Sequence, residues 1–306
     1  MDILTDILNT AGLRKRILNQ KSLYQDWGLT FPCPKSIGFH VIIQGKAYLW
    51  KSKNSEPMLL NKGDIAFMSR GSQHYITTHS NIKLLDQKQN EEIKDNSNRD
   101  PILTIVSGAY QLWNDPIHAL FNDLPSWKII NYNDINYLDS LQNCLKIISK
   151  ELEANQLGSE TIISSLLDVM FNLILRKIIN NEENNVWSHA FKDPVISKVL
   201  KLMHSYPDKE WTVESLAQSA GLSRAGFALK FKQILSDTPL NYLTTLRIFK
   251  ASDLLDKTDY NLEKIAHLVG YKDAFSFSKT FKRVTGISPK NFREINEKDK
   301  KLSYRF

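Results

Sequence analysis

Residues 212–242 read TVESLAQSAGLSRAGFALKFKQILSDTPLNY, and residues 261–292 repeat the pattern as NLEKIAHLVGYKDAFSFSKTFKRVTGISPKNF. The first half of each copy matches at an offset of 49 residues. The second half matches at an offset of 50, because one extra residue enters near Lys272. The matched pairs are Glu214/Glu263, Ala217/Ala266, Gly221/Gly270, Phe227/Phe277, Phe231/Phe281, Lys232/Lys282, Pro239/Pro289 and Asn241/Asn291. This repetition predicts two copies of one helical unit.

Each copy has the pattern of two short helices joined by a turn. A capping side chain stands before each predicted helix, and a glycine stands where the first helix must end. Two phenylalanines four residues apart turn an aromatic stripe inward on the second helix and leave its other face open. These positions are Thr212, Gly221, Ser223, Phe227 and Phe231 in the first copy, and Asn261, Gly270, Asp273, Phe277 and Phe281 in the second. The same pattern also fits an ordinary helical hairpin without a nucleic-acid role.

The distribution of charge favours nucleic acid. Residues 195–306 hold 20 Lys and Arg against 12 Asp and Glu, net +8, in a chain whose totals are 40 and 33. The other 194 residues are therefore net −1, and all the excess positive charge lies in the part that carries the repeat. Such an excess is expected where a protein contacts phosphates.

Many residues of the two copies, and of the segment between them, follow a known family pattern. They are Trp211, Thr212, Val213, Glu214, Gly221, Leu222, Ser223, Arg224, Thr238, Pro239, Arg247 and Ala251, followed by Ile265, Ala266, Gly270, Tyr271, Phe277, Phe281, Lys282, Arg283, Gly286, Pro289, Phe292 and Arg293. Residues 192–295 thereby resemble the DNA-binding domain of the AraC/XylS-type bacterial transcriptional regulators, which are commonly activators. The resemblance implies double-stranded promoter DNA as a partner, and RNA polymerase as a second partner if the protein is an activator.

The segment between the copies predicts one connecting helix. Pro239 after Thr238 suits the first position of a helix, and leucines and alanine continue at helical spacing to about Asp256. Roughly 18 residues span about 27 Å at ~1.5 Å per residue. A connector of this length is compatible with two recognition helices about one DNA turn apart, and equally with simple core packing of its leucines.

The family pattern also implies which side chains face DNA. They are Arg224, Ala225, Ala228, Leu229 and Lys232 in the first copy, and Lys272, Ala274, Phe275, Ser278, Lys279, Lys282 and Arg283 in the second. The first set offers few hydrogen-bond donors, whereas apolar groups such as Phe275 suit thymine methyls. Lys232, Lys272, Lys282 and Arg283 suit phosphates. The hypothesis is a T-rich site in which the second copy contributes more discrimination.

The protein is expected to be cytoplasmic. Hydrophobic and charged fractions of 42% and 24% are those of a soluble globular protein, and 306 residues suggest about two domains. No apolar stretch reaches the ~20 residues of a membrane span. The N-terminus has scattered charge in place of an apolar signal region, and its Ile3, Leu4, Ile7 and Leu8 predict a short amphipathic helix. The two cysteines are too few for a disulfide framework or a zinc site.

From about Trp27 to Ile105 the chain reads as short strands separated by turns, which favours a small barrel or sandwich. The predicted strands are 38–43, 47–50, 58–60, 64–68 and 83–85, and the polar segment 86–100 is predicted to be an exposed loop. The order Phe39, His40, Gly45, Leu60, Gly63, Asp64, Gly71 and His74 resembles the cupin-type sensor half of one AraC branch. The resemblance implies that a small-molecule effector contacts His40 and His74 inside the barrel.

Metal binding and catalysis are both disfavoured. A metal-binding cupin commonly has a His-x-His pair with a nearby carboxylate, whereas His40 is followed by Val41, Ile42 and Ile43. Neither a Ser/His/Asp motif nor a phosphate-binding glycine loop is present. No metal, cofactor or catalytic residue is therefore expected. Cys33 would be a redox sensor only if it were exposed with a lowered pKa.

A helical stretch follows the strands. The pattern predicts a short helix at 114–122, then helices at 134–154 and 158–180 that form an antiparallel hairpin. The second long helix is apolar around more than half its circumference, so its surplus apolar face meets either the protein's own core or another chain. A homodimer is the preferred interpretation. The polar run 180–185 predicts a linker, and Asp193 with Pro194 predicts a new helix at 195–205.

The sequence therefore predicts an α+β multidomain protein with an N-terminal cupin-like β-barrel and a C-terminal all-α domain containing two helix–turn–helix units. The expected domains are a sensor at 1–125, a helical hairpin and linker at 126–186, and a DNA-binding domain at 187–306. The predicted function is a sequence-specific DNA-binding transcriptional regulator, an activator that responds to a small molecule or stress signal through its cupin-like domain. The predicted location is the cytoplasm, in association with the bacterial nucleoid. The alternative is a cupin-type, metal-dependent enzyme with a nucleic-acid-binding tail.

Overall fold

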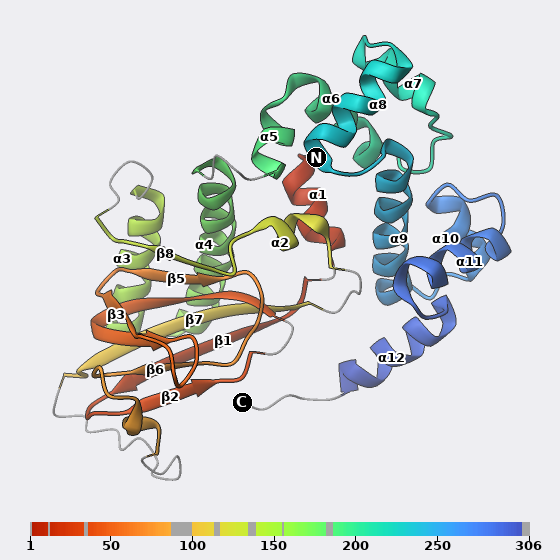
Figure 1. Cartoon of the computed structure of the whole chain (residues 1–306). Coiled ribbons are helices and arrows are strands. Elements are labelled where there is room, and N and C mark those ends of the chain that lie inside the picture. The colour runs from red at the N-terminus through yellow and green to blue at the C-terminus, as the bar shows by residue number, and fades with distance from the viewer. Residues whose placement is uncertain are drawn as a thin grey trace. The chain divides into compact units, whose positions relative to one another are not determined.

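The chain forms two compact units that interleave along the sequence. The computed structural model describes residues 2–11, 13–33, 36–86, 100–112, 117–133, 139–154, 156–181 and 186–301. The helical unit comprises Met1–Leu13, Trp113–Asp123 and Glu183–Phe306, and the sheet unit comprises Arg14–Leu112 and Leu124–Glu182. The domain ranges expected from the sequence are contiguous, whereas these units are not. Figure 1 labels their elements.

The sheet unit contains eight described strands. They are β1 (Leu13–Leu23), β2 (Gly28–Phe31), β3 (Ser36–Trp50), β4 (Met58–Asn61), β5 (Ile65–Met68), β6 (His74–Thr77), β7 (Leu103–Leu112) and β8 (Trp127–Ile130). One path runs β1-β7-β3-β5-β8, and β3 also pairs with β4 and β6, which continues to β2. The pairs of β3 with β4, β5, β6 and β7 are antiparallel, as are β2–β6 and β5–β8. The mixed helix and sheet class predicted from the sequence is confirmed, with the sheet in the N-terminal part.

The long strand β3 joins two layers of this sheet. Its first half pairs with β5 and β7, and its second half pairs with β4 and β6. The register shifts between Ile42 and Gln44, and Gly45 follows with a φ of +80°. A Cβ on Gly45 would lie 1.9 Å from the Ile102 carbonyl oxygen, so only glycine fits this bend. The prediction of separate strands at 38–43 and 47–50 is therefore wrong, because a bulge bends one continuous strand.

Other strand predictions were corrected by the structure. Residues 83–85 belong to the 3₁₀ helix η1 (Ile82–Asp86) and not to a strand. The strands β1, β2, β6, β7 and β8 were not among those predicted. The strand β8 lies between the helices predicted at 114–122 and 134–154, and its four residues pair with β5. A four-residue strand carries too little periodicity to be recognised, because its conformation depends on its partner. Of the polar segment 86–100, residues 87–99 lie outside the described part.

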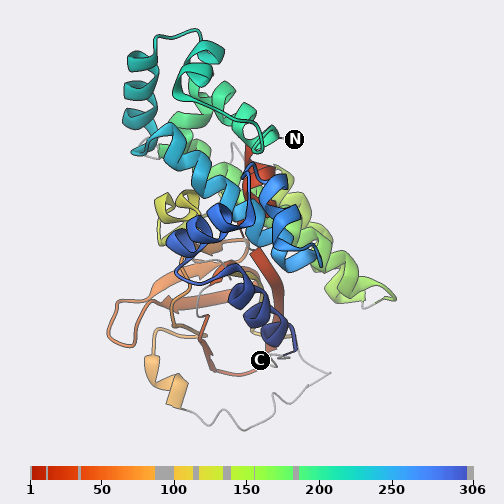
Figure 2. The ribbon, with the colours of Figure 1, turned by 90° about the vertical axis from the view of Figure 1, so that its right-hand side faces the viewer.

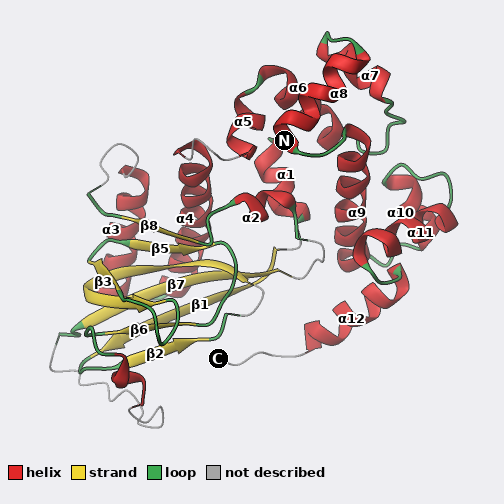
Figure 3. Ribbon diagram, viewed as in Figure 1, coloured by secondary structure: helices red, strands yellow, loops and turns green. Residues whose placement is uncertain are grey.

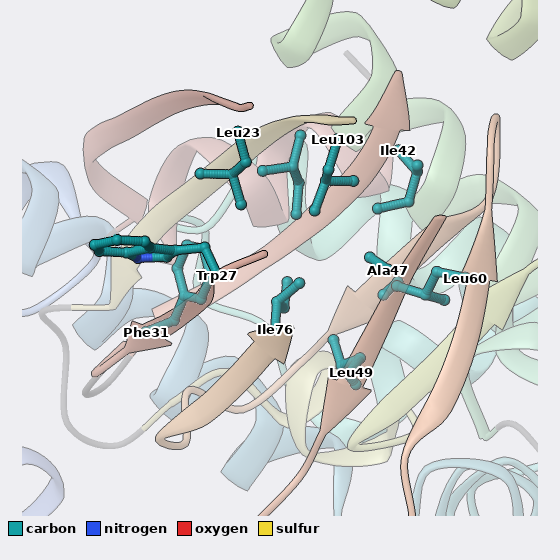
Figure 4. Packing of buried hydrophobic residues seen from close by; sticks show 11 residues of the cluster. Leu23, Trp27, Phe31, Ile42, Ala47, Leu49, Leu60, Ile76 and Leu103 are labelled. Atoms are coloured by element: carbon teal, nitrogen blue, oxygen red, sulfur yellow. The ribbon is translucent and has the colours of Figure 1, made fainter. Parts of the chain in front are cut away.

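The core of the sheet unit is a cluster of aliphatic and aromatic side chains contributed by several strands (Figure 4). Its members are Leu23, Trp27, Phe31, Ile42, Ala47, Leu49, Leu60, Ala66, Ile76, Leu103 and Ile105. They come from positions as far apart in the chain as Leu23 and Ile105, so this core depends on contacts that are distant in sequence.

Two antiparallel helices cover one side of this sheet (Figure 3). They are α3 (Asp139–Ala154) and α4 (Ser159–Asn181), which confirms the predicted hairpin within the described residues. Residues 134–138 and 155 of the predicted hairpin lie outside them. The helix α4 packs on β7 through the rings of Phe171 and Tyr110, whose centroids are 4.4 Å apart, and the Tyr110 hydroxyl donates to Asp168.

The helical unit is built from ten described helices. They are α1 (Ile3–Thr10), α2 (Ala119–Asp123), α5 (Val186–Lys192), α6 (Pro194–Ser205), α7 (Val213–Ala220), α8 (Arg224–Leu235), α9 (Pro239–Lys257), α10 (Leu262–Leu268), α11 (Ala274–Thr285) and α12 (Pro289–Lys301). The predicted helices at the N-terminus and at 195–205 are confirmed, while α5 was missed. The predicted helix at 114–122 is shorter, because residues 117 and 118 are not helical and 113–116 lie outside the described part. Of the predicted linker, residues 180 and 181 end α4, and 182–185 are likewise not described.

The N-terminal helix α1 packs within the helical unit, against α6 and α9. Asp6 is buried and accepts hydrogen bonds from His204 Nδ1 at 2.5 Å and from Lys250 Nζ at 2.9 Å. His204 Nε2 lies 2.7 Å from the Tyr242 hydroxyl. Burial alone would raise the pKa of Asp6, but the bonds from His204 and Lys250 outweigh it and leave that pKa lowered. Helix α1, whose Asp6 lies 198 positions before His204 in the chain, therefore completes the core of this unit.

The helix α9 connects the two helix–turn–helix pairs, α7–α8 and α10–α11, which lie toward its two ends (Figures 1 and 2). Thr238 caps it and Pro239 occupies its first turn, as predicted. Its 19 residues span about 28 Å at ~1.5 Å per residue. Among the described residues, no helix combines the length and the apolarity that a membrane span requires.

Candidate functional site

The two helix–turn–helix units begin from matching local signals. Thr212 and Asn261 cap α7 and α10 by accepting from backbone N–H groups at 3.0 Å and 2.8 Å. Ser223 and Asp273 cap α8 and α11 in the same way, at 3.2 Å and 2.7 Å. Hydrogen bonds from Ser276 lower the pKa of Asp273, so its carboxylate stays ionised at the helix N-terminus. All four caps predicted from the sequence are confirmed.

Glycines end the first helix of each unit, and phenylalanines fix the second. Gly221 and Gly270 have φ of +69° and +84°, a region that suits glycine. The ring centroids of Phe227 and Phe231 lie 5.8 Å apart, and those of Phe277 and Phe281 lie 5.6 Å apart. All four rings are fully buried. Each second helix is therefore held by its aromatic side, and its opposite side remains open.

The residues predicted to face DNA lie on these open sides. The exposed ones are Arg224, Ala225, Leu229 and Lys232 on α8, and Lys272, Phe275, Lys279, Lys282 and Arg283 on or beside α11. Ala228, Ala274 and Ser278 are half-buried. Leu229 is 60% exposed and Phe275 is 81% exposed, which is unusual for large apolar side chains. The exposed members of each set thus share the open side of α8 or of α11, except Lys272, which precedes α11.

The two faces differ at their N-terminal ends. On the first unit, Glu214 Oε1 pairs with Arg224 Nε at 2.7 Å, which holds the guanidinium across α7 and α8. On the second unit, the equivalent Glu263 accepts from the Ala274 backbone N–H at 3.3 Å and lies 3.5 Å from His267. The same carboxylate position therefore holds a cation in one unit and helps to cap a helix in the other.

Two further residues near these faces had no predicted role. Gln233 is exposed on α8 at the position that Arg283 occupies on α11, and the repeat offset of 50 residues is the signal that identifies it. Lys230, by contrast, pairs with Asp193 at 2.7 Å and lies away from the open face. The second residue is Arg247 on α9, which belongs to the family pattern but whose contacts no local pattern reveals.

A separate candidate site lies inside the sheet unit, where His40 on β3 meets His74 on β6. Their Nε2 atoms are 2.7 Å apart. His40 Nδ1 lies 2.6 Å from the Ser107 hydroxyl, and His74 Nδ1 lies 2.9 Å from the Ser72 carbonyl oxygen. Phe31 stacks on His74 at 5.2 Å, and Trp127 meets it edge-on at 5.0 Å. Both imidazoles are buried beside the hydrophobic core of the sheet unit.

The hydrogen bonds assign the tautomers of this pair. A carbonyl oxygen only accepts, so His74 carries its proton on Nδ1 and presents a lone pair at Nε2. His40 therefore donates from Nε2 and accepts the Ser107 proton at Nδ1. Burial lowers the pKa of both histidines, and for His40 the neighbouring His74 lowers it further. Both rings are thus neutral, and each nitrogen has a partner.

Cysteine and metal chemistry find little support at this site. Within the described residues, no group of three or more His, Cys, Asp and Glu side chains is arranged to hold a metal ion. Cys33 is half-buried, and burial raises its pKa. The condition for a redox-sensing thiolate, a lowered pKa, is not met.

Comparisons with known proteins agree with this architecture. A cupin family model matches residues 2–180, and a helix–turn–helix domain model matches residues 216–295. The chain is 28% identical over 308 residues to the HTH-type transcriptional regulator AlkR of Acinetobacter baylyi, covering 96% of this chain and 99% of the relative. It is 27% identical over 298 residues to the RCS-specific HTH-type transcriptional activator RclR of Escherichia coli, covering 96% and 98%.

Among solved structures, the DNA-binding domain of AdpA in complex with a target DNA is 27% identical. The match covers 37% of this chain and 100% of that domain, with a TM-score of 0.35. The family and the relatives are those of transcriptional regulators. With a cupin model over more than half its length and a helix–turn–helix domain after it, the chain belongs to the AraC-type DNA-binding transcriptional regulators that carry an N-terminal cupin domain.

Proposed function

We propose that this regulator binds promoter sites by placing α8 and α11 in two successive major-groove segments. The observation that carries this proposal is the single helix α9, which joins two units whose second helices both keep one face open. Its length of about 28 Å is close to the ~34 Å of one DNA turn. The net charge of +8 in residues 195–306 supports the same mode of binding.

We infer that the second unit supplies most of the sequence discrimination. The exposed face of α8 offers Arg224, which is held by Glu214, beside the apolar Ala225 and Leu229. The face of α11 offers Phe275 and Lys279 at the equivalent positions. A lysine donates to guanine acceptors, and an exposed apolar ring suits thymine methyls. Lys232, Lys272, Lys282 and Arg283 are assigned to phosphates, where they strengthen binding without specifying sequence.

The test is a comparison of equivalent positions in the two recognition helices. Duplexes selected by the full chain from a randomised pool would be measured against competitor DNA. Lys279→Ala and Phe275→Ala are each expected to lower the specific-to-nonspecific ratio by about 10-fold or more, since one base contact is worth ~1–3 kcal/mol. Leu229→Ala, at the α8 position equivalent to Lys279, is the matched control and is expected to change the ratio less. An unchanged ratio in both α11 variants would refute this division.

A phosphate role predicts a different signature. Lys282→Ala is expected to weaken binding to all sequences alike and to reduce the slope of log affinity against log salt concentration by ~1. Specific loss at one base position would instead assign Lys282 to base readout.

We further propose that a small-molecule effector binds at His40 and His74. The pair lies among Phe31 and Trp127 inside the barrel, and opening its Nε2–Nε2 hydrogen bond frees one donor and one acceptor for a ligand. A thermal-shift screen of small molecules tests this. A compound that raises the Tm of the wild type but not of His74→Phe supports the site, and compounds that stabilise both equally place the effector elsewhere.

A homodimer through α4 is the third part of the proposal. Ile162, Leu166, Val169 and Leu173 recur at intervals of four, three and four residues, and Ile162 and Val169 are exposed. This is the spacing of a helix–helix seam. Val169→Glu is expected to turn a dimer into a monomer in analytical ultracentrifugation, whereas Thr161→Glu, on the exposed polar side, leaves it intact. A wild type that is monomeric at every concentration contradicts the dimer.

Activation through RNA polymerase is the last part, and the name of the relative RclR, a transcriptional activator, supports it. In vitro transcription with bacterial RNA polymerase, from a promoter bearing the selected site, is expected to give more transcript in the presence of the protein. Less transcript would make the protein a repressor. A chain that shows no specific DNA retention in competitor would favour the cupin-enzyme alternative.

A further inference from the structure

The loop 206–211, which precedes α7 of the first helix–turn–helix unit, lies against the turn between α10 and α11 of the second. Arg247, on the connecting helix α9, donates from Nε to the Pro207 carbonyl at 2.7 Å and from Nη2 to the Lys209 carbonyl at 2.9 Å. Its guanidinium carbon also lies 5.8 Å from the centre of the Tyr271 ring. One side chain therefore contacts the loop 206–211 before α7 and the turn between α10 and α11.

The second unit is shaped to receive this contact. Gly270 has a φ of +84°, and a Cβ at this position would lie 2.7 Å from Arg247 Nη2 and 2.8 Å from both the Cα and the carbonyl oxygen of Asp208. Glycine is thus required here for close approach as well as for conformation. Tyr271 packs on the buried Phe277, with ring centroids 5.7 Å apart, so the contact reaches the core of the second unit.

The loop 206–211 is also held together by contacts among its own residues. The Trp211 indole N–H donates to the Tyr206 carbonyl at 2.9 Å, and the Trp211 backbone N–H donates to the Lys209 carbonyl at 2.8 Å. Lys209 also lies over the Trp211 ring at 4.2 Å. At the edge of the same contact, Lys272 and Glu210 form an exposed ion pair at 3.5 Å, which adds little stability by itself.

We infer that Arg247 is a positioning residue that sets the orientation of the two recognition helices, and thereby the spacing between DNA elements that the protein accepts. The inference rests on the proposed two-groove mode of binding. The helix α9 by itself fixes the distance between the two helix–turn–helix units. The contact of Arg247, which lies away from the axis of α9, fixes the rotation of one helix–turn–helix unit relative to the other about that axis. One added base pair moves an element by about 3.4 Å and turns it by roughly 35°, so accepted spacing reports this orientation.

The test measures the cost of changing the spacing. Duplexes selected by the full chain would be lengthened or shortened by one base pair between the two recognised elements. The wild type is expected to lose about 10-fold or more in affinity, because one element leaves register. In Arg247→Ala, the same change is expected to cost within ~3-fold, with weaker binding at the selected spacing. Arg247→Lys, which retains the charge and one donor group, is expected to lie between them.

Arg293 provides a matched control. It donates to the Leu255, Thr258 and Tyr260 carbonyl oxygens, all on the side of the second unit. Arg293→Ala removes a comparable set of hydrogen bonds and is expected to retain the wild-type spacing cost. If Arg293→Ala relaxes the spacing as much as Arg247→Ala does, general destabilisation explains both and the inference is wrong.

Gly270→Ala tests the same contact without removing a side chain. It is expected to separate the two units and to change the preferred spacing. Gly221→Ala and Gly286→Ala place alanine at a similarly positive φ, but nothing lies within 4 Å of the added Cβ, so the preferred spacing stays unchanged. An unchanged preference in Gly270→Ala contradicts the inference even if Arg247→Ala fails to fold.

A measurement without DNA separates this inference from the proposed function. Spin labels at Gln218→Cys and His267→Cys occupy equivalent exposed positions on α7 and α10, in a background with Cys33→Ser and Cys144→Ala. Double electron–electron resonance is expected to give one narrow distribution of distances between the two labels. Arg247→Ala is expected to broaden this distribution, and Arg293→Ala is not. An equally narrow distribution in Arg247→Ala overturns the inference, whether or not the protein binds two grooves.

Discussion

The first and second helix–turn–helix units are built alike inside and differ outside. Both are held by a buried phenylalanine pair and by capped helices. On the open faces, Ala225 and Leu229 of the first unit stand where Phe275 and Lys279 stand in the second. The comparison shows that the scaffold requires only a few positions in each unit. The remaining surface is therefore available for recognition without a cost to the fold.

Removing one ring from each core tests whether the two scaffolds are equivalent. Phe231→Ala and Phe281→Ala are each expected to lower the free energy of unfolding by about 3–5 kcal/mol, because both rings are fully buried. Urea denaturation followed by circular dichroism measures the change. Leu229→Ala, on the open face, is the control and is expected to cost less than ~0.5 kcal/mol. Markedly unequal losses in the two phenylalanine variants would show that the scaffolds differ inside as well.

The buried Asp6 provides a second test of whether the two helix–turn–helix units differ. Its hydrogen bond with His204 connects α1 to α6, and α6 packs against α7 of the first helix–turn–helix unit. Asp6→Asn keeps the volume but removes the charge that faces His204 and Lys250, at an expected cost of about 2–3 kcal/mol. Hydrogen exchange is expected to speed up more in α7 and α8 than in α10 and α11. Equal acceleration in both pairs would mean that α1 supports the whole unit evenly.

The same residue predicts a dependence on pH. The folded pKa of Asp6 is lowered, so its contribution to stability is fully present above the unfolded pKa of about 3.9 and disappears as the pH falls through the folded value. The wild type is therefore expected to lose stability below about pH 4 more steeply than Asp6→Asn. If stability fell equally steeply with pH in the two proteins below about pH 4, the assigned interactions of Asp6 with His204 and Lys250 would be contradicted.

Helix caps give a smaller and more symmetrical test. Ser223→Ala and Asp273→Ala are each expected to cost ~1 kcal/mol, because each leaves a first-turn N–H group without its side-chain acceptor. Thermal unfolding measures both. Ser223→Asp is a useful companion, since it introduces the carboxylate of the second unit into the first and is expected to preserve stability. A large loss in Ser223→Asp would show that the two turns are not interchangeable.

The exposed Glu214–Arg224 pair is expected to contribute least to stability. Glu214→Ala changes the free energy of unfolding by at most ~1 kcal/mol, since both side chains are well exposed. Its effect is expected in DNA binding, where a released Arg224 gains affinity for phosphates and the salt dependence becomes steeper. Glu263→Ala, at the equivalent position in the second unit, releases no such arginine. Identical salt slopes in Glu214→Ala and the wild type would leave Arg224 without a role in binding.

Much of the helical unit could be predicted from the sequence, because the residues that specify its helices lie close together in the chain. Caps, glycines and phenylalanines lie within a dozen residues of one another, so the repeat predicts both units and the helix between them. The sheet unit was predicted less well. The strands β1 and β8 were missed and the bulged β3 was divided, because strand conformation depends on pairing with residues far away in the chain.

The candidate sites show the same division. The open faces of α8 and α11 follow from helical periodicity, and even the missed Gln233 is recoverable from the repeat offset. The approach of His40 to His74 was expected only through the resemblance to cupins, and its hydrogen bonds were not predictable. Arg247 was recognised as part of the family pattern, yet its contact with Pro207, Lys209 and Tyr271 appears only when the two units are assembled.

The sequence by itself determined the duplicated helix–turn–helix, the basic character of its surroundings and the class of regulator, since these depend on short-range patterns and summed charge. Only the tertiary structure decided that α1 completes the helical unit and that the strand β3 bends between two layers of the sheet. It also decided that Arg247 lies between the two helix–turn–helix units. The hydrogen bonds of Asp6 and Arg247 join residues that are 38 to 244 positions apart, and no local preference specifies which distant partners will meet.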